Sequence, residues 1–205
     1  MPPVQLRKGD KGYCSQFNNH TTRRGSLEKV YKDFHCKDGR KVVLRTPRMS
    51  DLDNFLEFIN SLVDEGADIM MTEKKSREVE ADWLGKLLAE VEKGQAICVV
   101  PEVEGRVIGN SDIHRGTGKR SHTGTLGIAL SQDYRDVGIG SEMMRTLIEE
   151  ARKSGLEILQ LSVFDSNLRA RHVYEKLGFR EVGRLPKAIR RGDGYVDEVV
   201  MALEL

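Results

Sequence analysis

A short glycine-containing segment follows a predicted strand and leads into a predicted helix. It reads Arg135-Asp136-Val137-Gly138-Ile139-Gly140-Ser141. Glycine lets the backbone approach a ligand closely, and the first N–H groups of a helix have no partner within the helix. Together with the helix dipole, these groups favour a bound anion such as a pyrophosphate. The spacing is neither GxxxxGK[ST] nor a full GxGxxG, so nucleoside triphosphates and dinucleotides fit less well. An ordinary strand-to-helix turn remains the alternative.

A second group of residues begins at Asn167, just after the next predicted strand. Asn167, Ala170 and Tyr174 stand at i, i+3 and i+7, which places them on one face of a helix. They can therefore face the same ligand. A phenol with an ordinary pKa near 10 can donate a hydrogen bond while it stays protonated at neutral pH. The alternative is that Tyr174 only packs, in a buried stripe with Val173 and Leu177.

The elements that must position these groups follow from hydrophobic periodicity and turn residues. Strands are predicted over 30–35, 41–46, 96–100, 107–114, 123–130, 156–163, 179–184 and 195–203, and amphipathic helices over 50–63, 76–93, 138–154 and 167–177. Strand, helix and strand over 123–163 form a βαβ unit whose two strands should run parallel. The predicted fold class is therefore mixed α/β (α+β), with a mostly antiparallel twisted sheet, one parallel pair and helices on both faces.

Some details of these elements are also predicted. Ser50 is expected to cap the first helix, and either Asp165 or Ser166 the fourth. Trp83 is expected to lie in the core because it falls on the apolar side of the second helix.

Composition excludes several classes of protein. The chain has 205 residues, with 33 basic and 32 acidic side chains and a net charge of +1, which argues against nucleic acid or a membrane as partner. Cys14, Cys36 and Cys98 lack the spacing of a metal site, so no metal is predicted. No apolar run approaches about 18 residues, and the start of the chain lacks a signal peptide's apolar stretch. These features predict a cytoplasmic protein. Residues 1–29 read as a polar, basic extension, either a loose tail or an arm that holds a partner, and residues 30–205 as one domain.

The two residue groups together carry a family resemblance. The sequence has RxxGxG after a strand, then a helix and another strand, then NxxAxxxYxxxGF. In this order the motifs resemble the GNAT superfamily of acyl-CoA N-acyltransferases, over about residues 41–205. The C-terminal segments 183–186 and 195–198 look like the branch of ribosomal-protein, polyamine and small-amine acetyltransferases.

The resemblance implies a set of roles for acetyl-CoA binding. The strand before the glycine segment would splay from its neighbour, and its backbone would bond the pantetheine arm and the thioester carbonyl. Asn167 would also bond the pantetheine, and Tyr174 would stand near the sulfur. The implied backbone positions are Ile128, Ala129 and Leu130, and the implied pyrophosphate residues are Arg135, Asp136, Val137, Gly138, Ile139, Gly140 and Ser141.

The resemblance further implies direct transfer of an acetyl group from acetyl-CoA to a primary amine, either a small molecule or a protein N-terminus. The alternatives are an acyl-CoA-binding regulatory domain without catalysis and, less in keeping with the second motif, a nucleotide-binding module. An alkylamine is mostly protonated at pH 7, so a base must take a proton. Glu65 and Asp112 are the first candidates for this base. Whether the protein forms a homodimer is left open. Other candidate bases are His114, His122, Asp197 and Glu198.

Overall fold

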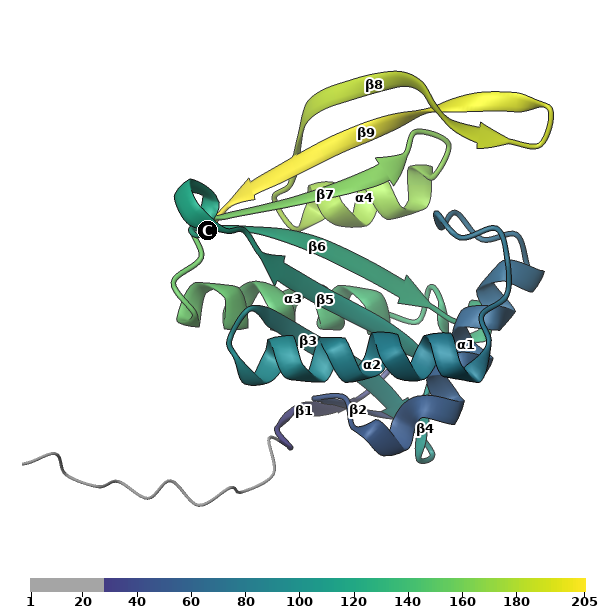
Figure 1. Ribbon diagram of the computed structural model, residues 1–205, viewed down its shortest axis with the longest axis vertical. Coiled ribbons are helices and arrows are strands. Elements are labelled where there is room, and N and C mark those ends of the chain that lie inside the picture. The colour runs from purple at the N-terminus through teal and green to yellow at the C-terminus, as the bar shows by residue number, and fades with distance from the viewer. Residues whose placement is uncertain (1–27) are drawn as a thin grey trace, which may run out of the picture.

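The computed structural model describes residues 28–205, and they form one curved sheet with helices on both faces (Figure 1). The strands are β1 (Val30–His35), β2 (Lys41–Arg45), β3 (Ala96–Val103), β4 (Arg106–Val107), β5 (Gly109–Arg115), β6 (Thr123–Leu130), β7 (Ile158–Phe164), β8 (Arg180–Arg191) and β9 (Gly194–Glu204). The helices are α1 (Leu52–Asp64), α2 (Arg77–Glu92), α3 (Ile139–Lys153) and α4 (Leu168–Lys176), with short 3-10 turns η1 (Met49–Asp51), η2 (Gly118–Arg120) and η3 (Gln132–Tyr134).

The sheet order is β1-β2-β3-β5-β6-β7-β9-β8, with β4 paired to β3. The β6–β7 pair is parallel and all other recorded pairs are antiparallel. The predicted mixed α/β fold with one parallel pair is therefore confirmed. Most of the predicted extension, residues 1–27, lies outside the described residues. Lys29, the last residue of the predicted extension, contacts the domain: its backbone N–H donates to Thr46 Oγ1 at 2.9 Å.

Two apolar clusters occupy the two faces of the sheet. On one face, α1 and α2 cover β3 through residues such as Phe55, Leu84 and Cys98. On the other face, α3 and the Tyr174 side of α4 pack on β5, β6, β7 and β9. Side chains alternate between the two clusters along β3, where Cys98 belongs to the α1–α2 cluster and Val99 to the α3–α4 cluster. The sheet therefore separates two apolar clusters, one covered by α1 and α2 and the other by α3 and α4.

The parallel strands β6 and β7 pair over only a short stretch. The paired residues are Thr123–Thr125 on β6 and Ile158–Gln160 on β7. Beyond them β6 continues along β5 as far as Leu130, while β7 continues along β9 as far as Phe164. The two strands diverge toward their C-terminal ends (Figure 1). The expected splay is therefore present, and α3 and α4 begin on either side of it.

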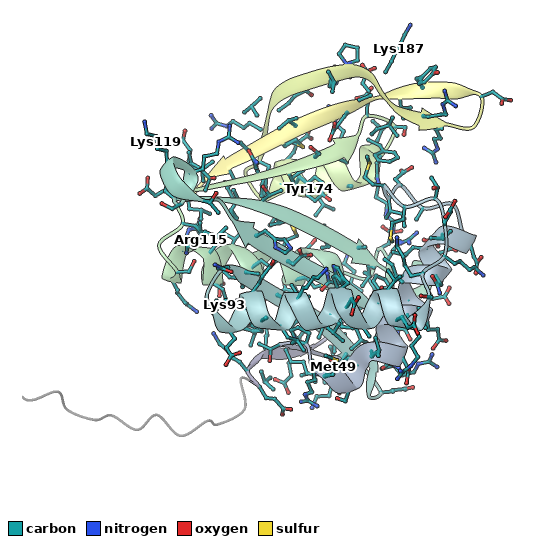
Figure 2. The ribbon with its side chains drawn as sticks, in the orientation of Figure 1. Met49, Lys93, Arg115, Lys119, Tyr174 and Lys187 are labelled. Carbon is teal, nitrogen blue, oxygen red and sulfur yellow. The ribbon has the colours of Figure 1, made fainter. Side chains whose placement is uncertain are left out.

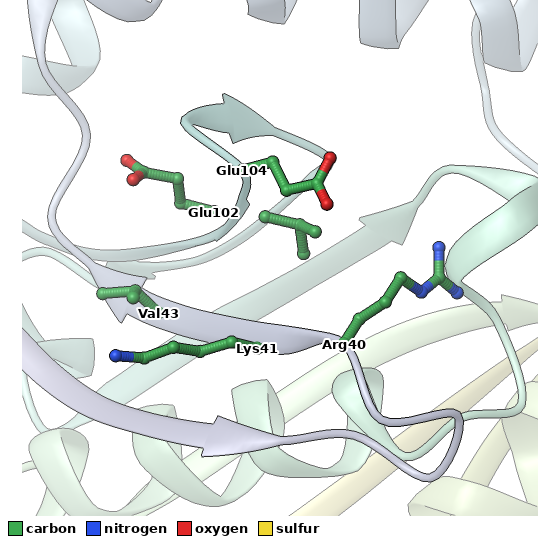
Figure 3. A pocket seen from close by; sticks show the side chains of 6 residues that line it. Arg40, Lys41, Val43, Glu102 and Glu104 are labelled. Atoms are coloured by element: carbon green, nitrogen blue, oxygen red, sulfur yellow. The ribbon is translucent and has the colours of Figure 1, made fainter.

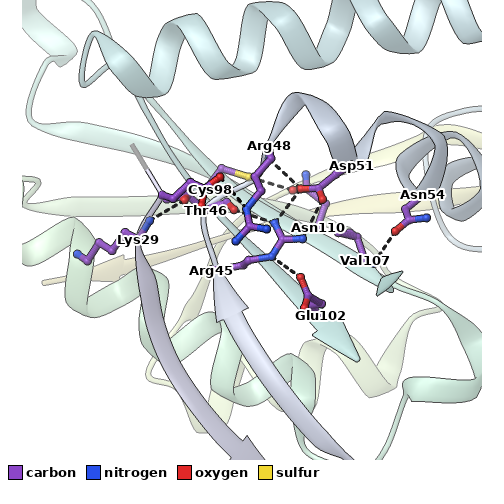
Figure 4. A network of polar contacts seen from close by, with 11 residues as sticks. Lys29, Arg45, Thr46, Arg48, Asp51, Asn54, Cys98, Glu102, Val107 and Asn110 are labelled. Carbon is purple, nitrogen blue, oxygen red and sulfur yellow. Dashed lines mark hydrogen bonds and ion pairs between the residues drawn. The ribbon is translucent and has the colours of Figure 1, made fainter. Parts of the chain in front are cut away.

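A buried ion pair fixes the start of α1 against the sheet. Arg45, on β2, is buried and donates to both carboxylate oxygens of Asp51 at 2.8 Å, and to Glu102 on β3 (Figure 4). Asp51 also accepts from the N–H of Arg48 at 2.8 Å. Removing one partner would leave a buried charge uncompensated, which is strongly unfavourable. The network therefore positions α1, and with it Glu65 at the helix end.

Several predicted details differ from the structure. Ser50 lies in η1 and is not the cap of α1, since η1 precedes the helix. Asn167, and neither Asp165 nor Ser166, caps α4. Trp83 is 37% exposed, and its ring contacts that of Phe55 edge-on, so it lies at the margin of the core and not inside it.

The predicted strand 179–184 is only part of β8, which runs to Arg191. Nearly all of its residues are exposed, so the chain there has no apolar alternation to signal a strand. Among residues 28–205, no helix is long and apolar enough to cross a membrane.

Candidate functional site

The start of α3 is left open for an anion. Gly138, the residue before the helix, has φ +95°, a conformation that suits glycine, and Asp136 also has a positive φ of 65°. Within the described chain, no side chain caps this helix. A methyl group placed on Gly140 would meet only Ile128 Cδ1, at 3.9 Å. The free N–H groups of the first turn therefore face space that a phosphate can enter.

One edge of β6 faces the opening between the strands. Ser131 N–H donates to Ile108 O on the β5 side at 3.0 Å. Backbone groups alternate sides along a strand, so Ile128 and Leu130 present theirs toward β7 while Ala129 bonds toward β5. Of the three residues expected to hold pantetheine, two thus offer backbone groups to the gap, and Arg135 Nε already occupies the Leu130 carbonyl at 2.8 Å.

Tyr174 comes from the α3 face of the sheet. It is 8% exposed, and its ring lies 6.1 Å from that of Phe179 (labelled in Figure 2, where β6 and β7 separate). Burial raises the pKa of Tyr174 to about 12. No residue in 28–205 hydrogen-bonds its hydroxyl. The phenol therefore keeps its proton at neutral pH and can donate a hydrogen bond to a ligand.

Asn167 is the N-cap residue that directly precedes α4. Its Oδ1 accepts from the N–H of Ala170 at 3.0 Å. This bond uses the oxygen, and the side-chain NH₂ group remains available as a donor. Asn167 can therefore cap the helix and donate to a pantetheine carbonyl at the same time.

Glu65 and Arg135 bind each other. The Arg135 guanidinium contacts the Glu65 carboxylate while its Nε bonds the end of β6. Both side chains are partly buried, at 16% and 29% exposure. Arg135 therefore balances the charge of Glu65 and links the end of α1 to the end of β6.

Asp112 lies beside the strand that borders the opening. It stands opposite Gly127 of β6, and a methyl group placed on Gly127 would lie 3.5 Å from Asp112 Oδ1. Asn110 donates to that oxygen at 3.0 Å, and His114 Nε2 lies 2.7 Å from the other. Because Gly127 has no side chain, the Asp112 carboxylate can lie against the β6 backbone. It does so on the α1–α2 side of the sheet, opposite Tyr174.

His114 links Asp112 to the surface. Its Nδ1 lies 2.9 Å from Glu90 Oε2 on α2. Hydrogen bonding to Asp112, reinforced by the charges of both carboxylates and opposed by partial burial, raises the pKa of His114. Asp112 therefore stands in a chain of ionisable groups that reaches solvent.

The remaining candidate bases lie elsewhere. His122 precedes β6, at the opposite end of that strand from Leu130. Asp197 accepts from the N–H of Lys187 at 2.9 Å, and this bond, with Arg184, lowers the pKa of Asp197. Glu198 stands opposite Phe164 at the open end of β7. Asp112 is thus the candidate placed directly against β6 without an arginine or lysine partner among the described residues.

The sequence matches the family described as "Acetyltransferase (GNAT) family" over residues 62–179, more than half of the chain. This chain belongs to the GNAT acetyltransferase family. The [ribosomal protein bS18]-alanine N-acetyltransferase of Escherichia coli is 37% identical over 78 residues, which cover 38% of this chain and 53% of that enzyme. The chain thus spans about half the length of that relative.

Two further similarities extend over more of the GNAT chain. An uncharacterized N-acetyltransferase of Methanocaldococcus jannaschii is 30% identical over 171 residues, covering 77% of this chain and 73% of that protein. The solved structure of yncA from Salmonella typhimurium with its cofactor acetyl-CoA matches with a TM-score of 0.71 at 20% identity, covering 80% of this chain and 94% of that one. At this identity the structural match shows the fold.

A hollow of about 350 Å³ lies apart from the GNAT motifs (Figure 3). It is lined by Arg40, Lys41, Val43, Glu102, Val103 and Glu104, at the β2–β3 margin of the sheet. None of these residues belongs to the β6 edge, the α3 start or the surroundings of Tyr174. The hollow is therefore separate from the candidate site.

Sequence reasoning missed Asn110 and Glu90. Asn110 orients Asp112 from two positions away on the same strand, a spacing that a strand pattern would have revealed. Glu90 reaches His114 from α2 across 24 residues of sequence, and no local pattern signals that contact.

Proposed function

We propose that this protein is an N-acetyltransferase that transfers the acetyl group of acetyl-CoA directly to a primary amine. The observation that carries the proposal is the opening between β6 and β7, with the uncapped start of α3 at its end, free backbone groups on β6 along its side, and Tyr174 and Asp112 on its two faces. Membership of the GNAT family supports the same reading.

The start of α3 would hold the phosphates, and the gap would hold the pantetheine arm. The arm carries amide groups, which can bond the unpaired β6 backbone as another strand would. Asn167 can donate to an amide carbonyl from the other side of the opening. A backbone N–H of β6 aimed at the thioester oxygen would stabilise the negative charge that develops there during attack.

Asp112 is proposed as the base. The amine nitrogen attacks the thioester carbon, and one of its protons passes to Asp112 directly or through a water molecule. Asn110 and His114 hold the carboxylate in place for this step. Glu65 is less suited to it because its partner, Arg135, stays charged at every working pH, whereas His114, the partner of Asp112, can lose its proton.

Tyr174 is proposed to assist departure of the sulfur. When the C–S bond breaks, the thiolate needs a hydrogen-bond donor. A thiol has an ordinary pKa of about 8.5, below that of the buried phenol, so stabilisation by a hydrogen bond is favoured over complete proton transfer. The thiolate can then leave without an external acid.

The acceptor is proposed to be a protein N-terminus or a small amine. Acetyl-CoA would be supplied with a panel of acceptors: a peptide with N-terminal alanine, free amino acids and a polyamine. Release of free thiol would be followed, and the acetylated product identified by mass. We expect release with one class of acceptor. Binding of CoA without release by any acceptor would support the non-catalytic, acyl-CoA-binding alternative.

The base assignment has its own experiment. Asp112→Asn should lower turnover most at low pH, where little free amine exists, whereas Glu65→Gln should leave the shape of the pH profile unchanged. If Asp112→Asn also leaves that shape unchanged, the base lies elsewhere, and Glu198 becomes the next candidate.

A further inference from the structure

The turn between β1 and β2 is docked against the segment that precedes α3. Lys37 N–H donates to Val137 O at 3.0 Å, and the Arg40 guanidinium donates to Asp133 O at 2.8 Å. Arg40 also lies over the ring of Tyr134, 4.2 Å from its centroid. These contacts fix the turn against residues 133–137, the segment that leads to Gly138.

The turn is also braced internally. Asp38 accepts from the Cys36 thiol at 2.8 Å and from Arg40 Nε at 2.9 Å. Bonds from Arg40 and Cys36 lower the pKa of Asp38, so this carboxylate stays ionised and paired. A braced and docked turn holds the backbone of Lys37 at a defined place beside the α3 start.

The Lys37 side chain lies over Gly138. A methyl group placed on Gly138 would have Lys37 Cε as its nearest neighbour, at 3.9 Å. No carboxylate among residues 28–205 pairs with Lys37. The ammonium group is therefore an unpaired cation beside an uncapped helix start, where both favour the same anion.

The other cations around this helix start are already engaged. Arg135 is held by Glu65 and by the Leu130 carbonyl, and Arg169 lies 2.6 Å from Asp136. Arg40 is held by Asp38. If Arg135 turned to a phosphate, Glu65 would remain partly buried without its partner, which is costly. Within residues 28–205, the Lys37 side chain has no ion pair to break when it binds an anion.

We propose that Lys37 supplies the cation that binds the pyrophosphate of acetyl-CoA, and that Arg135 is a positioning residue between α1 and β6. This rests on the proposed function. The β1–β2 hairpin, which lies outside both sequence motifs, is then part of the cofactor site. The turn delivers one charge to the phosphates while the α3 backbone delivers the hydrogen bonds.

The test measures affinity by calorimetry with three probes: CoA, 3′-dephospho-CoA and pantetheine. Lys37→Ala should weaken binding of CoA and of 3′-dephospho-CoA equally, by roughly 10-fold or more, and leave pantetheine binding unchanged because that probe has no phosphate. Lys37→Arg should restore most of the affinity. Lys41→Ala is the matched control, since Lys41 is an exposed lysine of the same hairpin that faces Asp33 at 3.4 Å. Thermal melting of each variant verifies that it is folded.

The outcomes separate the two proposals. Unchanged CoA affinity in a folded Lys37→Ala protein overturns the role of Lys37 while leaving the proposed function intact. A loss with CoA but not with 3′-dephospho-CoA would place Lys37 on the 3′-phosphate, which also overturns the assignment. Failure of the unaltered protein to bind CoA would instead remove the proposed function itself.

Discussion

The two helices that follow the parallel strands begin in opposite ways. The N-cap residue of α4 is Asn167, whose side chain caps the helix. The N-cap residue of α3 is Gly138, which is in a left-handed conformation, and no side chain among residues 28–205 caps that helix. A cap satisfies an N–H group from within the protein, and its absence leaves that group to a ligand. In the proposed function, α3 accordingly holds the phosphates through its backbone, and α4 contributes side chains to the acyl end.

The largest effect is expected at α4. Tyr174→Phe keeps the ring and removes the hydroxyl, so kcat should fall roughly 10²- to 10⁴-fold with CoA affinity nearly unchanged. Steady-state and single-turnover kinetics would measure it, once chemistry is shown to limit the rate. Tyr195→Phe is the control, because Tyr195 is an exposed tyrosine on β9. A near-normal kcat for Tyr174→Phe would assign the residue to packing alone.

The next effect is expected at α3. Gly140→Val should weaken CoA binding roughly 10-fold or more, about 1.4 kcal/mol or above, because its side chain would fill the approach to the helix start. Gly85→Val is the matched control: Gly85 also lies in a helix, and a methyl group there meets only the flexible end of Met49, at 3.7 Å. Calorimetric titration gives both affinities. Equal affinities in the two folded variants would contradict an anion site at α3.

A smaller effect is expected from removing either of two helix N-caps, Ser76 before α2 or Asn167 before α4. Ser76 caps α2 by accepting from Val79 N–H at 3.3 Å, as Asn167 caps α4. Ser76→Ala and Asn167→Ala should each lower the free energy of unfolding by about 1 kcal/mol. Only Asn167→Ala should also weaken CoA binding, since only Asn167 lies at the opening. Denaturant unfolding and calorimetry would separate the two roles, and a fall in CoA affinity with Ser76→Ala would show that capping itself is responsible.

The smallest effect concerns the opposite face of the sheet. The raised pKa of His114 means that its pairing with Asp112 and Glu90 adds stability that is fully present below the unfolded pKa of about 6.5 and is lost as pH rises through the folded pKa. Because His114 is 49% exposed, the contribution should stay below about 1 kcal/mol.

His114→Gln tests this pairing. The variant should lose stability relative to the parent at pH 5.5 and converge with it at high pH, as measured by denaturant unfolding at each pH. His172→Gln, an exposed helical position, is the control. A constant difference between parent and His114→Gln at all pH values would show that the pairing does not depend on protonation.

Much of the frame could be predicted because its signals are local. The inward residues of α3, such as Met143 and Leu147, recur with the helical period and are fully buried. The strand 123–130 has the predicted bounds, and Gly178 ends α4 with φ +95°. The part of β8 beyond residue 184 was not predicted, because a strand whose side chains are nearly all exposed shows no alternation of apolar and polar residues.

By itself, the sequence determined the order of elements, the glycine segment before α3 and the face shared by Asn167 and Tyr174, because each depends on residues a few positions apart. Only the tertiary structure decided which charges are free. Glu65 and Arg135 neutralise each other across 70 residues, and Lys37 comes to lie over Gly138 from a distant hairpin. Such contacts follow from how strands and helices pack, and a charged side chain looks the same in a sequence whether or not it will find a partner.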